Sequence, residues 1–261
     1  MSKKSTSSRG SVCQALLALV SAWLLCSPAT AQTSGGLLND TGQTQCVNAS
    51  NVLGACDDAS TGNAATHPRQ DGRFGRDVAS PTKIGGGAAG FDFTPLDASG
   101  SPIALTGSPA VPSATPRCVK DNVTKLIWEV KTTSGLQSSA HYYAWGSNPG
   151  GNYCGGTVTP CNTNAYIAAL NAADLCGETA NDWRLPTRRE LLSIVHYGLP
   201  DYSTAMIDVA YFPNTQANWY WTSDTYAPNP GYAWFVYFGG GGTGADSEPD
   251  SSYVRLVRSG Q

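Results

Sequence analysis

The sequence has few charged side chains and no excess of basic ones. Charged residues make up 13% of the 261 positions, and 16 Lys and Arg stand against 19 Asp and Glu, which gives a formal net charge of −3. Proteins that hold nucleic acid through its phosphates carry a clear positive charge on the binding surface. The composition therefore excludes bulk nucleic-acid binding and disfavours a grip on polyanions through net charge.

Long apolar runs are also absent, apart from one near the N-terminus. That run covers residues 12–25, follows three basic residues, and is too short and too interrupted for a transmembrane helix. It is followed at 29–31 by A-T-A, an A-x-A cleavage pattern. We therefore expect a signal peptide over 1–31 and an exported protein, in the periplasm, at the outer surface or outside the cell, with no membrane span. Cleavage before Gln32 would remove three basic and no acidic residues and leave a net charge of 13 − 19 = −6.

Cys26 offers an alternative form of export. A Cys at the end of an apolar run is the attachment point of lipid in lipoproteins, where a small residue precedes it. Here the preceding residue is the bulky Leu25. A lipoprotein anchored at Cys26 is therefore the second alternative.

Metal-binding spacings are missing as well. No C-x-x-C pair occurs, and His67, His141 and His196 have no ligand-like spacing to any Cys. We therefore expect no metal and no cofactor. Six Cys remain after cleavage, and an even number in an exported chain predicts three disulfides. These residues are Cys46, Cys56, Cys118, Cys154, Cys161 and Cys176.

A catalytic nucleophile with its base is not recognisable. No G-x-S-x-G motif occurs, and disulfides would consume every thiol of the exported chain. His196 lies late in a predicted helix, where a His is typically a partner of the helix dipole. His141 lies among aromatic residues, which is typical of a packing or surface position. We expect a non-enzymatic protein; the alternative is an envelope enzyme without a recognisable catalytic set.

Large aromatic side chains are nearly absent before residue 118. Residues 32–117 contain three Phe and no Trp or Tyr, whereas 118–261 contain six Trp, all twelve Tyr and three Phe. Aromatic residues dominate the energetics of cores, so the main core is predicted in 118–261. Residues 32–117 are rich in Gly, Ala, Ser and Pro, and are predicted to form a loop-rich extension with a small disulfide clip.

Hydrophobic patterns in 118–261 predict an α+β fold. A helix is predicted over 163–175, with Thr163 or Asn164 as its N-cap and Gly177 as its stop. Alternating or continuous apolar stretches bounded by turn residues predict strands. These strands cover 123–130, 219–223, 232–239 and 253–258.

The stretch DWRLPTRREL (182–191) is rich enough in Trp and Arg to suggest a site, yet each position has a structural explanation. Trp183 and Leu185 fall on one face of an extended segment. Thr187 and Glu190 have the T-x-x-E spacing of a capping box. An apolar helical stripe is then predicted at Leu191, Ile194 and Val195. A strand leading into a capped helix is therefore favoured over a catalytic motif.

Segments across nearly all of 118–261 resemble, in order, the Lcl C-terminal domain family of exported bacterial proteins. Besides the Cys154 and Cys161 pair around a Gly-rich loop, they are CVKDNVTKLIWEVKT (118–132), AYIAALNAADLCG (165–177), DWRLPTRREL (182–191), YFPNT (211–215), YWTSDTY (220–226), AWFVYFGGG (233–241) and VRLVRSG (254–260). DWRLPT-x-x-EL is also similar to a segment of formylglycine-generating enzymes. That similarity implies a C-type-lectin-like α+β domain with two helices and a small twisted antiparallel sheet, stabilised by disulfides.

The resemblance also bears on cysteine pairing and on function. Together with proximity in the sequence, it implies Cys46–Cys56, Cys154–Cys161 and Cys118–Cys176. An adhesin-type member of the family binds sulfated glycosaminoglycans, which implies a recognition or adhesion module here. The expected partner is a glycan or sulfated polysaccharide, or else an envelope or host protein. An enzyme of the hydrolase or formylglycine-generating type remains the alternative.

Two kinds of side chain are candidates for ligand contact. Arg suits carboxylate and sulfate because its planar fork makes two parallel hydrogen bonds. Aromatic rings suit sugar faces, although core packing is the competing explanation for each ring. The candidates are Arg184, Arg188, Arg189, Arg255, Arg258, Trp145, Trp219 and Trp221, with Tyr142, Tyr143 and Trp234 as further rings. Glu248-Pro249-Asp250 resembles a calcium-and-sugar motif of C-type lectins, but the surrounding stretch is also typical of a solvated loop.

Overall fold

The computed structural model describes residues 39–47, 53–56, 70–78, 82–177, 181–199 and 204–260. Contacts divide the chain into residues 1–35 and 36–261, and every described residue belongs to the second unit. The predicted signal peptide, its cleavage site and Cys26 lie outside the described residues. Within the described ranges, no helix has the length and apolar character needed to span a membrane. Short helices and small antiparallel sheets make up the fold, which confirms its mixed α and β character.

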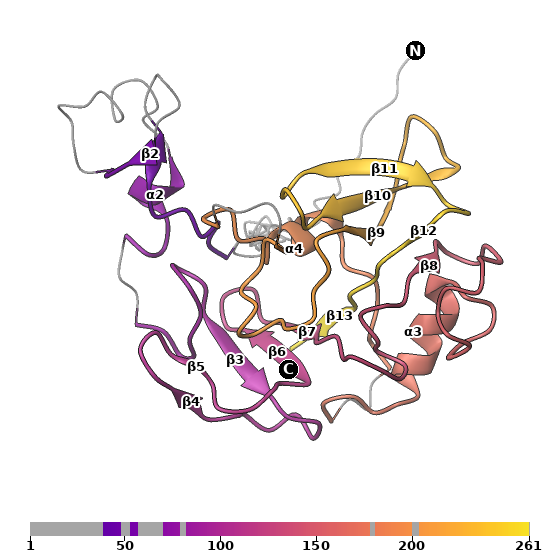
Figure 1. Ribbon diagram of the computed structural model, residues 1–261, viewed down its shortest axis with the longest axis horizontal. Helices are drawn as coiled ribbons and strands as arrows, with labels where there is room; N and C mark the ends of the chain where they lie inside the picture. Colours follow the sequence, from indigo (N-terminus) through magenta and orange to yellow (C-terminus); the bar gives the residue numbers. More distant parts are fainter. Residues whose placement is uncertain are drawn as a thin grey trace, which may run out of the picture. The chain divides into compact units, whose positions relative to one another are not determined.

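A four-stranded antiparallel sheet has the order β13-β7-β6-β3, and its strands lie side by side in Figure 1. Val119 and Trp128 are direct partners in its central strands and both are fully buried. One edge strand comes from before residue 118, so the extension is part of this sheet. The strands are β3 (Phe93–Leu96), β6 (Cys118–Asp121), β7 (Leu126–Glu129) and β13 (Val257–Ser259).

The strand predicted over 123–130 is wrong in its first half. The chain turns there because the Asp121 carboxylate accepts the backbone N–H groups of Val123, at 2.9 Å, and Thr124, at 3.2 Å. Lys125 then adopts a φ of 65°, which lies outside the β region. β7 begins at the next residue.

A three-stranded antiparallel sheet has the order β11-β10-β9. Its strands are β9 (Trp219–Thr225), β10 (Tyr232–Tyr237) and β11 (Thr243–Ser247). The first two confirm the strands predicted at 219–223 and 232–239, with shifted ends. β10 ends at Tyr237 because a Gly-rich turn follows, in which the Gly241 N–H donates to the Tyr237 carbonyl at 2.7 Å. β11 occupies part of the stretch that looked like a solvated loop.

α3 (Thr163–Asn171) is shorter than the helix predicted over 163–175, and its N-cap is Asn162. The Asn162 side chain accepts the Ala165 N–H at 2.9 Å, a contact that Thr163 and Asn164 do not make. The helix cannot continue to 175 because Asp174 and Cys176 adopt φ values of 48° and 57°. A turn therefore follows α3 and carries Cys176 to its disulfide.

α4 (Arg188–Leu192) begins with the predicted capping box. The Thr187 hydroxyl accepts the Glu190 N–H at 3.2 Å, and the Glu190 carboxylate accepts the Thr187 N–H at 2.8 Å. The helix is only five residues long. Ile194 and Val195 are buried as expected, but they follow the helix and do not extend a helical stripe.

The single strand predicted over 253–258 is also wrong, because the chain passes there from one sheet to another. β12 (Ser251–Ser252) pairs with β8 (Tyr143–Ala144), and β13 pairs with β7. Between them, Tyr253 forms one bridge to Tyr220. The crossing covers both sides of this segment, so 254–258 are buried without alternation.

Three disulfides tie the chain together in the pairing that the family resemblance implied. They are Cys46–Cys56, Cys118–Cys176 and Cys154–Cys161. The first joins the ends of a small pair of strands in the extension, beside a one-turn helix. The remaining elements, all before residue 118, are β1 (Cys46–Val47), β2 (Leu53–Gly54), α2 (Asp71–Phe74), β4 (Leu105–Thr106) and β5 (Val111–Pro112).

The core consists of two clusters rich in aromatic residues. One includes Trp128, Tyr220 and Phe238, and also takes Phe91 and Phe93 from before residue 118. The core is therefore wider than the predicted 118–261. The other cluster combines aromatic rings with the sulfur atoms of two disulfides. Its largest members are Tyr143, Tyr166, Trp183 and Trp221.

Candidate functional site

A groove of about 560 Å³ lies beside the three-stranded sheet and is lined by several aromatic rings and carboxylates. One wall comes from β9 and β11, and the other from the segments that flank β8 and β12. We call it the aromatic groove. Its lining residues are Tyr142, Gly151, Tyr153, Trp219, Asp246, Pro249, Asp250 and Ser251.

The sheet sets the position of Trp219, the first residue of β9. Trp219 and Trp221 point to the same face because side chains alternate along a strand. Trp221 is fully buried, whereas Trp219 at the strand end is 42% exposed. The Trp219 ring stacks on Phe235 of the neighbouring strand, with centroids 5.0 Å apart and an interplanar angle of 18°. The indole is therefore held in place while part of its surface faces solvent.

Two tyrosines stack on the opposite wall. The rings of Tyr142 and Tyr153 lie 4.8 Å apart at 20°, and Tyr253 packs against Tyr142 at 5.6 Å. The disulfide-closed loop that begins at Cys154 follows Tyr153 directly. Tyr153 is 50% exposed, which is unusual for a ring already stacked on another. Rings held in fixed orientations at a surface lose little conformational entropy when a ligand binds.

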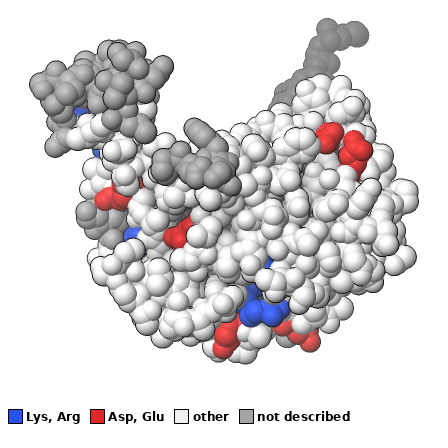
Figure 2. Space-filling model, viewed as in Figure 1, with Lys and Arg blue, Asp and Glu red and all other residues white. Residues whose placement is uncertain are grey.

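The charged side chains that line the groove are both acidic. Asp246 lies on β11 and its carboxylate accepts the Ser247 N–H at 2.9 Å. Asp250 lies in the turn before β12 and is exposed. Figure 2 shows red atoms in the region where Figure 1 draws β10 and β11, and no blue atoms beside them. The groove therefore offers hydrogen-bond acceptors and negative charge next to aromatic rings.

The candidate Arg residues of the DWRLPTRREL stretch lie away from this groove's lining. Arg184 forms a two-point salt bridge with Glu190, at 2.8 and 2.7 Å. The guanidinium of Arg188 lies 4.0 Å from the ring centroid of Trp234. Arg189 is exposed. Only Arg189 lacks a described partner among these three, so they do not form a basic cluster available to a ligand.

The other two candidate Arg residues are buried, which corrects the expectation that they add to a surface patch. Arg255 is fully buried and donates to the Glu129 carbonyl at 2.5 Å. Arg258 is 7% exposed, donates to the Cys176 carbonyl at 3.2 Å and lies over the Trp183 ring. Both brace the C-terminal segment against the core.

Two of the candidate Trp residues also serve the core. Trp221 donates from its indole N–H to the Tyr143 carbonyl at 2.8 Å. Trp145 donates in the same way to the Thr222 carbonyl at 2.8 Å and packs against the second core cluster. Of the three Trp candidates, only Trp219 lines the groove.

The sequence was compared with known families and proteins. Residues 117–258, more than half of the chain, match the Lcl C-terminal domain. The chain belongs to the Lcl C-terminal domain family. No curated protein and no solved structure matches it. The aromatic groove lies entirely within the matched part of this Lcl C-terminal domain.

The Glu248-Pro249-Asp250 motif is not part of a described cluster of acidic side chains. Among the described residues, no three His, Cys, Asp or Glu side chains converge as metal ligands would. Glu248 turns toward Asn148, whose side-chain N–H donates to it at 3.4 Å. Asp250 instead lines the aromatic groove. This motif contributes a carboxylate to the groove and no described metal site.

The two described histidines occupy packed positions. His196 follows α4, and its Nδ1 accepts the Gly198 N–H at 3.1 Å, so the ring is neutral there. Burial lowers the pKa of His196. Because α4 already ends at Leu192, His196 does not lie in its last turn, which corrects the expectation of a helix-dipole partner. Burial also lowers the pKa of His141, which lies edge-on to Tyr143. Among the described residues, no Ser, Thr or Cys side chain is hydrogen-bonded to either imidazole.

A charged network that the sequence did not reveal lies in the core. Lys131 is 2.9 Å from the Glu129 carboxylate and 3.0 Å from the Tyr166 hydroxyl, and all three are buried. Burial lowers the pKa of Lys131, and burial together with the Glu129 charge raises the pKa of Tyr166. The second Glu129 oxygen accepts the Leu256 N–H at 2.9 Å. The charged and polar groups of the network therefore bind one another. Because the network is buried, a substrate cannot reach it.

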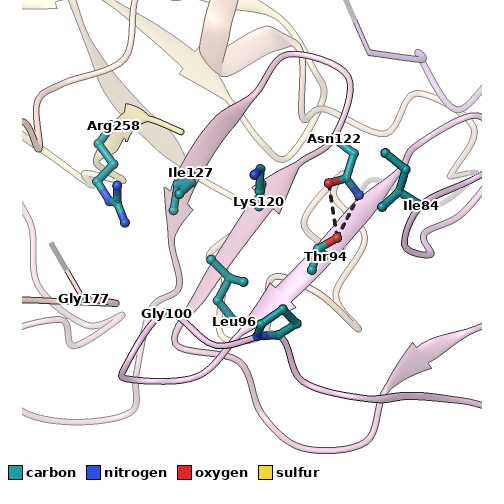
Figure 3. Close-up of a pocket in the computed structure, with 10 residues that line it drawn as sticks. Ile84, Thr94, Leu96, Gly100, Lys120, Asn122, Ile127, Gly177 and Arg258 are labelled. Carbon is teal, nitrogen blue, oxygen red and sulfur yellow. Dashed lines mark hydrogen bonds between the residues drawn. The ribbon is translucent and has the colours of Figure 1, made fainter. Parts of the chain in front are cut away.

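A second cavity, of about 380 Å³, lies against the four-stranded sheet (Figure 3). Leu96 and Ile127 contribute apolar surface, and Thr94 is hydrogen-bonded to Asn122 on its rim. Its buried basic group is Arg258, which already holds the turn after α3. We assign no ligand to this cavity.

Several groove residues were missed from the sequence. Tyr153 lies in a Gly-rich stretch, GGNYCGG, that looked like a plain loop. Asp246 lies in GGTGADSEPDSS, which looked solvated. A useful signal was available in both places, because an aromatic or acidic residue within a rigid, Gly-rich or disulfide-closed loop is well placed for binding.

Proposed function

We propose that this chain is an exported, non-enzymatic recognition module that binds an unsulfated glycan in the aromatic groove. The observation that carries the proposal is the grouping of Tyr142, Tyr153 and Trp219 with Asp246 and Asp250 around one groove. Aromatic rings pack against the apolar faces of sugars, and carboxylates accept hydrogen bonds from sugar hydroxyls. Both kinds of group line the groove, in positions set by the sheet and by the disulfide-closed loop.

The charge of the groove favours an unsulfated ligand. A sulfate group placed between Asp246 and Asp250 would be repelled by both carboxylates. Like charges repel, and the repulsion falls off with distance. The Arg residues that could have compensated lie elsewhere or are buried. A sulfated polysaccharide is therefore the less favoured ligand.

The fold and the expected export of the protein also support the proposal. The short helices, small antiparallel sheets and three disulfides suit a C-type-lectin-like domain. The apolar run and A-x-A pattern at the N-terminus support export, to the periplasm, the outer surface or beyond. Disulfides persist in such compartments. The Lys131–Glu129 pair is buried, and in the described part of the chain neither imidazole is hydrogen-bonded to a Ser, Thr or Cys side chain, so we favour binding over catalysis.

The test is a glycan array followed by affinity measurements on the oxidised, mature protein. We expect binding to unsulfated glycans and a loss of roughly tenfold or more for Trp219→Ala and for Asp250→Asn. Phe74→Ala and Asp174→Asn are matched controls, because both positions are exposed and lie outside the groove. Melting temperatures confirm that each variant is folded. Binding that survives both groove substitutions, or that is confined to sulfated glycans, would contradict the proposal.

A further inference from the structure

The aromatic surface continues past the groove, along the three-stranded sheet. Tyr237 in β10 is the direct cross-strand partner of Trp219 in β9. The two are 37% and 42% exposed. Cross-strand partners have Cβ atoms about 5 Å apart, so the two side chains start from neighbouring positions on one face of the sheet. Single exposed apolar residues are common at surfaces, but adjacent ones mark binding sites more often.

Two glycines lie directly against the aromatic rings of this face. Phe235 lies over Gly244, where a Cβ atom would come within 2.5 Å of the Phe235 ring. Because Gly244 has no side chain, Phe235 can lie flat and support Trp219 from beneath. Gly239 backs the Tyr237 ring in the same way, since a Cβ there would lie 2.5 Å from its Cζ. The two rings are thus supported on one side and uncovered on the other.

The chain leaves β10 at Tyr237 through a glycine-rich turn, which the Tyr197 hydroxyl holds by donating to the Gly241 carbonyl at 2.7 Å. This turn contains four glycines, 239–242, and a Cβ placed on Gly242 would meet no atom within 4 Å. No described hydrogen bond uses the Tyr237 hydroxyl, which leaves it available to a ligand. Trp219 and Tyr237 are both partly exposed on this face, so accessible aromatic surface extends beyond the residues that line the groove.

We infer that the groove binds internal units of an extended polysaccharide, with Tyr237 forming an additional sugar subsite beside Trp219. The inference rests on the proposed function, because Trp219 is shared between the groove and the Tyr237 subsite. One sugar unit lies among Tyr142, Tyr153 and Trp219, and the chain continues over Tyr237 toward the glycine turn. The ligand class is therefore a linear, unsulfated polysaccharide and not a single capping sugar.

The experiment uses length series of unsulfated oligosaccharides, from one to about six units, of the cello-, chito- and xylo- types. Affinities are measured with the mature, oxidised wild type, Tyr237→Ala and Tyr237→Phe. We expect wild-type affinity to rise about tenfold as the chain grows beyond the groove, which corresponds to about 1.4 kcal/mol. Tyr237→Ala should lose that gain and bind the shortest ligands like wild type. Tyr237→Phe keeps the ring and should retain most of it.

The outcomes separate this inference from the proposed function. Wild-type affinity that does not change with length would overturn the Tyr237 subsite and leave glycan binding in the groove intact. A length gain that persists in folded Tyr237→Ala would do the same. If no oligosaccharide and no array glycan binds, both proposals fail together. If Tyr237→Ala does not fold, the wild-type length series alone decides whether affinity rises with the length of the oligosaccharide.

Discussion

The guanidinium of Arg184 and the carboxylate of Glu190 form a two-point salt bridge, with N–O distances of 2.8 and 2.7 Å. The same carboxylate accepts the Thr187 N–H and so completes the N-terminal cap of α4. Arg184 therefore joins the extended segment before the helix to the cap itself. Within the motif that looked most like a site, Arg184 and Glu190 therefore have a structural role, because they satisfy one another.

The first prediction concerns this cap. Thr187→Ala removes the hydroxyl that accepts the Glu190 N–H, and we expect it to lower the free energy of unfolding by about 1 kcal/mol. Thr187→Ser keeps the hydroxyl and should cost much less. Urea denaturation of both variants measures the difference. Equal losses in the two would show that the methyl group matters and the cap hydrogen bond does not.

How far the sequence predicts the structure depends on the range of the interactions involved. The capping box was predictable because it needs only Thr187 and Glu190, three residues apart. The burial of Arg255 was not predictable, because an alternating strand would place Arg255 on the face opposite Val254 and Leu256. The segment instead crosses between two sheets that cover both of its sides, and only tertiary structure determines such a crossing.

The candidate site was predictable in part for the same reason. Trp219 and Tyr142 stood out as surplus rings in the sequence. Their partners Tyr153, Asp246 and Asp250 come from a loop, from β11 and from the turn before β12, and nothing local shows that these segments meet. The burial of Arg255 and Arg258 was not predictable, because a count of basic residues does not distinguish a free guanidinium from one already bound to the core.

The second prediction concerns acid stability. Burial lowers the pKa of His196 below its ordinary value of 6.5, although the nearby carboxylates of Asp208 and Asp40 oppose the shift. The unfolded chain therefore takes up a proton at this His before the folded chain does. Its contribution to stability is present above pH 6.5 and is lost as the pH falls toward the folded-state pKa, by at most about 1.4 kcal/mol per pH unit.

His196→Asn checks this sign, because its Oδ1 can accept the Gly198 N–H in place of Nδ1. Urea denaturation between about pH 8 and pH 5 should give a shallower decline for the variant than for wild type. The slopes of the two proteins should coincide above about pH 7.5, where position 196 takes up no proton in the folded or the unfolded chain. Parallel declines through the acid range would mean that His196 is not responsible.

The third prediction separates scaffold from site. Trp183 is 2% exposed, and its backbone N–H and carbonyl are both bound by the Asn171 side chain. Trp183→Ala should cost about 3–5 kcal/mol of stability. Trp183→Phe should cost less, because most of the ring volume is kept. Glycan affinity, measured where each variant is folded, should be unchanged for both, and a folded variant without affinity would place Trp183 in the site.

The last prediction concerns salt and the Arg pair. Arg188 lies over Trp234 and Arg189 is exposed, but neither lines the aromatic groove. Contacts through a basic patch weaken as salt rises, because exposed charges are screened over roughly 8 Å at physiological ionic strength. Stacking and hydrogen bonding to an uncharged sugar lack that dependence. We therefore expect glycan affinity to change less than about twofold between low and high salt, and Arg188→Ala/Arg189→Ala to bind like wild type.

The double variant should lose only about 0.5–1 kcal/mol of stability, from the lost Arg188–Trp234 contact. A steep fall in affinity with salt, abolished in the double variant, would instead locate recognition on these two Arg residues and make a sulfated or carboxylated ligand the better proposal.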